Sequence, residues 1–200
     1  MKEKKENKEF HAKWENFWYY YKYHVIAAVF VLVMIGVFIN DKLQQIDYDY
    51  RIAAITENNL TEEQISGLEK DFQNIADDRN KDGEVHVQIT NYTISEDENA
   101  NYQVKMANQT KLMADFEAGD SMIFMYTDGI YETYKEQSIF DVKDGVQLKL
   151  ADCKGNTQPD VNDLNIAMRL FEGTSMEKKE DLNQYYKDCK KLFENFKDGK

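Results

Sequence analysis

The chain has 200 residues and a formal net charge of −12, from 37 acidic and 25 basic side chains. The six lysines and four glutamates before residue 41 sum to +2, so residues 41–200 carry −14. So acidic a surface argues against a nucleic-acid partner and against a domain that lies flat on an anionic bilayer. A segment of this length is long enough to bury a complete hydrophobic core.

An apolar run of fifteen residues, 25–39 (VIAAVFVLVMIGVFI), predicts a membrane span. As a helix the run covers roughly 22 Å, which is short of a hydrocarbon core of about 30 Å. The aromatic residues between Phe17 and Tyr23 are typical of the headgroup level, so the predicted span is extended to residues 17–40. Neither a small-residue cleavage site nor a lipid-carrying cysteine follows, which favours an uncleaved signal anchor over a removed signal peptide.

The lysines predict the orientation of this anchor. Six of them lie between Lys2 and Lys22, whereas Lys42 and Arg51 are the nearest basic residues behind the span. Because cationic residues stay on the cytoplasmic side, the N-terminus is expected inside the cell. The predicted parts are a cytoplasmic tail (1–16), a transmembrane signal anchor (17–40), a connector (41–50) and an extracytoplasmic α/β domain (51–200).

The domain is expected to begin with a strand over residues 51–56 (RIAAIT). A helix should follow, because Thr61 and Gln64 have the spacing of a capping box and Leu60 and Ile65 that of a hydrophobic staple. One face of this helix would carry the apolar residues Ile65, Leu68, Phe72, Ile75 and Ala76.

Two further strands and a helix are predicted next. Val85, Val87 and Ile89 alternate with polar residues, which indicates a strand. A helix is expected over residues 97–118, and residues 121–126 (SMIFMY) form a continuous apolar strand typical of the buried centre of a sheet. The inward residues of that helix would be Tyr102, Met106, Met113 and Phe116. The alternation of strands and helices predicts parallel βαβαβ pairing.

The C-terminal part has a different pattern. Residues 130–140 look helical, and alternating apolar residues over 146–150 and 164–170 indicate a pair of strands; the second of these segments is also compatible with a helix. Thr174 and Glu177 have capping-box spacing, and a full apolar stripe follows them to Phe196. The predicted fold class is therefore α/β: an N-terminal transmembrane helix, then one lobe with a mixed sheet that combines a parallel βαβαβ part with a two-strand C-terminal addition, flanked by helices.

The order of parts from residue 52 to residue 142 resembles the first lobe of bacterial extracellular solute-binding proteins, with a periplasmic binding protein-like fold. The resemblance is carried by the strands IAAIT and EVHVQIT, by the segment AGD that leads into a strand closing on YTD, and by IFDV after it. It covers about half of the outer domain and implies a single, truncated, membrane-anchored lobe. Such proteins close two lobes on a ligand and are usually anchored through a lipid-modified cysteine, which this chain lacks.

Open α/β sheets bind ligands beyond the carboxyl ends of their parallel strands. In this chain these ends carry short polar residues that also suit ordinary turns and caps. The candidate ligand-binding residues are Glu57, Asn58, Asn59, Asn91, Tyr92, Thr127 and Asp128.

The sequence holds little that supports catalysis. His86 is the one histidine behind the anchor, and no motif of a nucleotide-binding loop, serine hydrolase or zinc protease occurs. We therefore expect no catalytic residues, no cofactor and no metal site. Residues 78–83 (DRNKDG) match the first positions of a calcium loop, but the twelfth position is Ile89 instead of glutamate, which favours a plain turn.

The two cysteines, Cys153 and Cys189, leave two alternatives open. Export permits a disulfide between them, but a buried free thiol at each position is favoured because Cys189 lies on an apolar helix face.

Two functions are considered. The favoured hypothesis is a bacterial single-pass membrane protein, held in the lipid bilayer by residues 17–40, whose outer domain is a non-catalytic interaction module for another membrane protein or an exported ligand. The alternative is a degenerate solute-binding lobe that recognises a small molecule or a peptide.

Overall fold

The computed structural model describes residues 3–44, 46–94 and 102–200, which fall into two units with the boundary between Ile46 and Asp47. The first unit is helix α1 (Glu3–Gln44). Its segment Phe17–Asn40 is long and apolar enough to cross a membrane, and none of it is buried. The helix therefore extends into the predicted connector of residues 41–50.

The second unit also begins earlier than expected. The prediction placed its start at Arg51, but Asp49 and Tyr50 are already buried, with 0% and 2% of their surface exposed. Asp49 is fixed to the rest of the domain, because its carboxylate accepts hydrogen bonds from the backbone N–H groups of Arg79, Asn80 and His86 at 2.8–2.9 Å. The last residues of the predicted connector are thus part of the fold.

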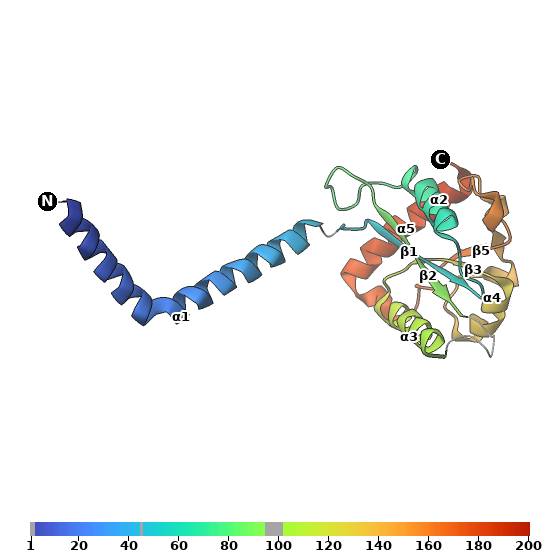
Figure 1. Cartoon of the computed structure of the whole chain (residues 1–200). Helices are drawn as coiled ribbons and strands as arrows, with labels where there is room; N and C mark the ends of the chain where they lie inside the picture. Colours follow the sequence, from blue (N-terminus) through green and yellow to red (C-terminus); the bar gives the residue numbers. More distant parts are fainter. Residues whose placement is uncertain (1–2, 45, 95–101) are drawn as a thin grey trace. The chain divides into compact units, whose positions relative to one another are not determined.

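The second unit is built on a five-stranded mixed sheet in the order β2-β1-β3-β5-β4. Figure 1 labels β1, β2, β3 and β5 of this sheet and the helices around it. Strand β1 pairs in parallel with both β2 and β3, whereas β5 is antiparallel to both β3 and β4. The strands are β1 (Tyr50–Thr56), β2 (Val87–Thr93), β3 (Ile123–Tyr126), β4 (Leu148–Lys149) and β5 (Asn165–Met168). A strand is present in each predicted segment, but β2 begins at Val87 and not at Val85, and β4 and β5 are shorter than the predicted 146–150 and 164–170. The second segment of the C-terminal pair is a strand and not a helix.

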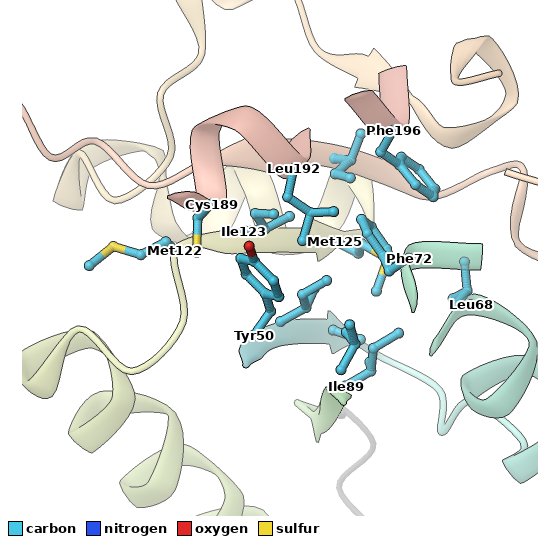
Figure 2. Packing of buried hydrophobic residues seen from close by; sticks show 14 of the residues in the cluster. Tyr50, Leu68, Phe72, Ile89, Met122, Ile123, Met125, Cys189, Leu192 and Phe196 are labelled. Carbon is cyan, nitrogen blue, oxygen red and sulfur yellow. The ribbon is translucent and has the colours of Figure 1, made fainter. Parts of the chain in front are cut away.

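Helices cover both faces of this sheet. One face packs against α2 (Glu62–Gln73) and α5 (Glu180–Asp198), where the rings of Phe72 and Phe196 stack with their centroids 4.0 Å apart. Figure 2 shows this layer, with Leu192 and Phe72 directed at the strands. The other face packs against α3 (Tyr102–Ala118) and α4 (Asp128–Tyr134) through Phe116 and Tyr134.

Strand β1 shows why the sheet needs both layers. Ile52 and Ala54 belong to the core on the α2 and α5 side, whereas Ala53 and Ile55 belong to the core on the other side. All four are fully buried. An apolar run without alternation suits a strand that is covered on both faces, and the same holds for β3, the predicted central strand.

Short 3₁₀ turns complete the unit. They are η1 (Lys135–Gln137), η2 (Lys143–Gly145), η3 (Leu150–Asp152), η4 (Pro159–Val161) and η5 (Ser175–Lys178). The predicted helix over residues 130–140 is accordingly shorter: α4 ends at Tyr134, η1 follows, and Phe140 forms an isolated bridge with Arg169.

The two predicted capping boxes had different outcomes. At α2 the box is confirmed: Gln64 N donates to Thr61 Oγ1 at 3.2 Å, and Thr61 N donates to Gln64 Oε1 at 2.9 Å. The box at Thr174 is wrong, since its hydroxyl donates to Phe171 O and Glu177 accepts from Gly173 N. These bonds form a turn around η5, and α5 begins only at Glu180.

The inward face predicted for α3 is partly wrong. Tyr102 and Met106 are exposed, by 72% and 42%, and the buried residues are Leu112, Asp115 and Phe116. Only the second half of the helix covers the sheet, so the apolar spacing near its start does not mark a core face. The predicted residues 97–101 of this helix lie outside the described part of the chain.

Both cysteines are free thiols in the core on the α2 and α5 side. This agrees with the favoured alternative and not with the disulfide. Burial raises the pKa of Cys153 to about 11 and that of Cys189 to about 12, so both are protonated and poorly nucleophilic at neutral pH.

Candidate functional site

The carboxyl ends of β1, β2 and β3 lie at one edge of the sheet, since the three strands are parallel neighbours. This edge brings together six of the seven predicted binding residues. Four further residues join them: Thr56 and Thr93, which end β1 and β2, Asn165, which begins antiparallel β5 opposite Tyr126, and Lys149, which ends β4 opposite Asn165.

The first group at this edge is an amide cluster, formed by Thr56, Asn58, Asn59, Asn91 and Thr93. Asn59 Oδ1 accepts hydrogen bonds from Asn91 Nδ2 at 2.6 Å and from Thr93 Oγ1 at 3.0 Å. Thr56 Oγ1 donates to Asn58 O at 2.7 Å, which closes the turn after β1. The cluster therefore joins the ends of β1 and β2 with its own hydrogen bonds.

The second group is a carboxylate cluster, formed by Glu57, Thr127, Asp128, Lys149 and Asn165. Thr127 Oγ1 donates to Glu57 Oε2 at 2.5 Å and accepts from Ile130 N at 3.4 Å as the cap of α4. Asp128 Oδ1 accepts from Asn165 Nδ2 at 2.6 Å and from Lys149 Nζ at 3.1 Å. The cluster thus links β1, β3, β4 and β5.

The charge of Asp128 is stabilised by its neighbours. The hydrogen bond from Asn165 and then that from Lys149 lower the pKa of this carboxyl, against a small opposing effect of burial. Asp128 is therefore ionised at neutral pH and neutralises Lys149 within the cluster.

Two polar atoms at this edge have no hydrogen-bond partner among the described residues. They are Tyr126 Oη and Asn165 Oδ1, on residues that face each other across β3 and β5, and both residues are fully buried. Buried polar atoms are normally paired, so each of these two atoms retains an unused hydrogen-bonding capacity.

Tyr92 is the predicted binding residue that does not belong to this edge site. It is buried, 7% exposed, and its hydroxyl donates to Asp115 Oδ2 at 2.9 Å. Asp115 also accepts from Ser121 N and Ser121 Oγ at 2.9 and 2.7 Å. Tyr92 therefore ties β2 to α3 in the core, where burial raises the pKa of its hydroxyl.

Sequence reasoning missed Thr56, Thr93, Lys149 and Asn165. The last two follow from the antiparallel addition, since the first residue of an antiparallel strand lies at the same edge as the last residue of its neighbour. The signal was available: a polar residue, Asn165, stands directly before the apolar run IAM.

The loop of residues 78–83 has the geometry of a turn. Asp78 accepts from Lys81 N and Gly83 N, Asn80 Oδ1 accepts from Asp82 N, and Asp82 Oδ1 accepts from Glu84 N, at 2.6–2.9 Å. These oxygens are occupied by backbone N–H groups. Among the described residues no cluster of three or more His, Cys, Asp or Glu side chains is arranged to hold a metal ion.

Comparison with known proteins adds no assignment: no family model, no curated protein and no solved structure matches this chain.

Proposed function

We propose that this chain is a single-pass membrane protein of a bacterial cell whose folded domain is a non-catalytic interaction module outside the cytoplasm. The observation that carries the anchor is segment Phe17–Asn40 of α1, which is apolar, helical and unburied over its whole length. In water such a segment would expose a continuous apolar surface, and a bilayer removes that surface from water.

The orientation rests on the charge pattern. The excess of lysine before residue 23 favours a cytoplasmic tail, and the acidic domain would then face the outside. The bilayer is thus one partner, through residues 17–40, and a neighbouring membrane protein is the other.

The arrangement of the edge site supports interaction rather than catalysis. Its carboxylates, Glu57 and Asp128, each accept a hydrogen bond within the site, and His86, the histidine behind the anchor, lies beside Glu84 Oε2 at 3.1 Å. By contrast, the first turns of α3 expose Tyr102, Val104 and Met106, by 72%, 55% and 42%. Tyr102 and Met106 are four residues apart and share one face of the helix, and exposed apolar side chains on one face are typical of a surface that a protein partner covers.

Labelling of introduced cysteines on intact cells tests the anchor and its orientation. The native thiols are buried with raised pKa values, so wild type should react slowly with a membrane-impermeant maleimide and serves as the background. We expect Lys187→Cys, at an exposed position of α5, to be labelled without lysis, and Lys13→Cys to be labelled only after lysis. The opposite pattern, or release of the protein by alkaline carbonate, would contradict the proposal.

Purification from native membranes after cross-linking tests the interaction module. Met106→Asp places a charge on the exposed face of α3 that Tyr102 and Met106 share, and should reduce recovery of the partner. Val146→Asp, at a position that is 76% exposed and outside α3, is the matched control and should retain it. Equal recovery with both variants would exclude α3 as the docking surface.

The unpartnered atoms Tyr126 Oη and Asn165 Oδ1 support a second candidate function, a lobe that recognises a small molecule or a peptide at the carboxyl edge. A thermal-shift screen against sugars, peptides and divalent ions tests it. Stabilisation by one compound that is lost in Asn165→Leu would favour this second function over the first.

A further inference from the structure

A cleft of about 270 Å³ lies at the opposite edge of the sheet, where β1 and β3 begin. It is formed by the start of β1, the loop after α2, the turn before β3 and the first turns of α5. None of the predicted binding residues belongs to it. The lining residues that the argument uses are Arg51, Arg79, Asp120, Asp181, Leu182 and Tyr185.

One wall of the cleft is basic and held in place. Arg79 N donates to Asp49 Oδ1 at 2.8 Å, Arg79 Nε donates to Asp49 O at 2.9 Å, and the guanidinium carbon lies 5.0 Å from the centre of the Tyr185 ring. Tyr185 is fixed in turn, because its hydroxyl accepts from Arg51 N at 2.9 Å. The guanidinium of Arg79 is thus oriented by two groups, the carbonyl oxygen of Asp49 and the ring of Tyr185.

The residue that fixes this wall is Asp49, which is fully buried. Burial acts to raise its pKa, but three backbone N–H groups and the charge of Arg79 together hold the pKa below its ordinary value. Asp49 is therefore ionised, and its two carboxylate oxygens accept from the backbone N–H groups of residues 79, 80 and 86.

The other wall is acidic. A Cβ placed on Gly119 would lie 3.4 Å from Leu182 Cδ1, so the turn before β3 packs directly on α5. The residues beside this contact are Asp120 and Asp181, both exposed, one from each element. Tyr185 follows Asp181 by four residues on α5, which places the acidic group one helical turn from the ring that carries Arg79.

The lining carries two guanidinium groups, Arg51 and Arg79, and four carboxylates, Asp47, Asp49, Asp120 and Asp181. The charge of Arg79 acts on the buried Asp49, and among the described residues none of Arg51, Arg79, Asp120 and Asp181 forms a close ion pair. A guanidinium fork suits a planar carboxylate, and a pair of carboxylates suits an ammonium group. The cleft is close to the lower limit of ligand pockets, which is about 300 Å³, so it suits a molecule of amino-acid size.

We propose that this cleft binds a small zwitterion, with its carboxylate at Arg79 and Arg51 and its ammonium at Asp120 and Asp181. The apolar surface of Leu182 and the ring of Tyr185 contact the side chain of the bound molecule. The class of ligand is a free α-amino acid. This site does not depend on the proposed docking role, since the labelling and co-purification experiments above do not involve the cleft.

Three related compounds test the proposal on the full-length protein in detergent, by saturation-transfer NMR titration. L-leucine carries both charges, N-acetyl-L-leucine lacks the ammonium, and L-leucinamide lacks the carboxylate. We expect saturable binding of L-leucine and affinities at least about tenfold weaker for the other two, since each loses a charged hydrogen-bonding group. Equal binding of all three, or no saturation by L-leucine below about 10 mM, would overturn the proposal.

Two variants locate the binding. Arg79→Gln should weaken binding of L-leucine at least about tenfold, and Asp181→Asn, an exposed change that cannot disturb packing, should reduce the preference for L-leucine over N-acetyl-L-leucine. Lys190→Gln is the matched control, because Lys190 lies 5.9 Å from the ring of Tyr186 on the same helix but outside the cleft. Binding that is unchanged in both cleft variants, or weakened equally in Lys190→Gln, would refute the assignment.

Discussion

Asn165 Nδ2 donates a hydrogen bond of 2.6 Å to Asp128 Oδ1, which joins the first residue of antiparallel β5 to the first residue of α4 after parallel β3. Asn165 is fully buried, whereas 69% of the Asp128 side chain is exposed. This bond closes the carboxyl edge of the sheet on the side where the parallel part meets the antiparallel addition.

The Asp128 carboxylate should make stability depend on pH. Its pKa is lowered in the folded protein by Asn165 and Lys149, so the stabilisation is complete above the unfolded pKa of about 3.9 and is lost as the pH falls through the lower folded value. We expect Asp128→Asn to be less stable than wild type at pH 7, with the difference shrinking below about pH 4. Thermal unfolding of residues 47–200, at pH 7 and at a pH below about 4, measures the difference in stability between the variant and wild type. Asp152→Asn, an exposed acidic residue of η3, is the control and should show no such convergence.

The two threonines with capping-box spacing should respond differently to truncation. Thr61→Ala removes the N-cap of α2 and should cost about 1 kcal/mol of unfolding free energy. Thr174→Ala removes a hydroxyl that caps no α-helix, so its cost should stay below about 0.5 kcal/mol. Urea denaturation curves give both values. A larger loss for Thr174→Ala would mean that η5 and α5 form one capped helix in solution.

Gly155 should tolerate no side chain. A Cβ there would lie 2.7 Å from the backbone oxygen of Phe196, and Gly155 N also donates to this oxygen at 2.8 Å. Backbone at the end of α5 cannot move aside, so Gly155→Ala should cost about 2–3 kcal/mol of unfolding free energy. Gly129→Ala is the contrast: its Cβ meets the end of the flexible Glu57 side chain, and we expect a smaller loss, about 1 kcal/mol or less. Equal losses of unfolding free energy for the two variants, measured in denaturant, would show that the backbone at the C-terminus of α5 moves to make room for the Cβ.

Asp115 should be important for the core between β2, β3 and α3. It accepts hydrogen bonds from Tyr92 and Ser121, and Asp115→Ala would leave these buried donors without partners. We expect a loss of about 2–4 kcal/mol of unfolding free energy, and a smaller loss of about 1 kcal/mol for Tyr92→Phe, which removes a single hydrogen bond. The double variant then shows whether the two residues act together. Additive losses would contradict the network.

Much of the fold was predictable because its signals are local. The capping box at Thr61, the apolar run of β3 and the alternation before Ile89 each reflect a rule that acts within a few residues. The order of strands and helices then indicated parallel pairing, and parallel pairing indicated which strand ends share an edge.

The errors arose where local spacing competes with contacts distant in sequence. Thr174 and Glu177 have the spacing of a cap, but their bonds to Phe171 and Gly173 form a turn instead. Tyr102 and Met106 have the spacing of an inward face, but both are exposed, and the buried residues of α3 are Leu112, Asp115 and Phe116.

The sequence by itself determined the apolar helix, the α/β class and the polar character of the strand ends, because hydrophobicity and turn chemistry are properties of neighbouring residues. Only the tertiary structure decided which polar groups meet. Tyr92 points into the core and bonds to Asp115. Asn165 and Lys149, which belong to β5 and β4, lie at the carboxyl edge beside Asp128. Arg79 lies over the ring of Tyr185 at the other edge. These contacts depend on the register and direction of the strands, which are set by packing over the whole domain.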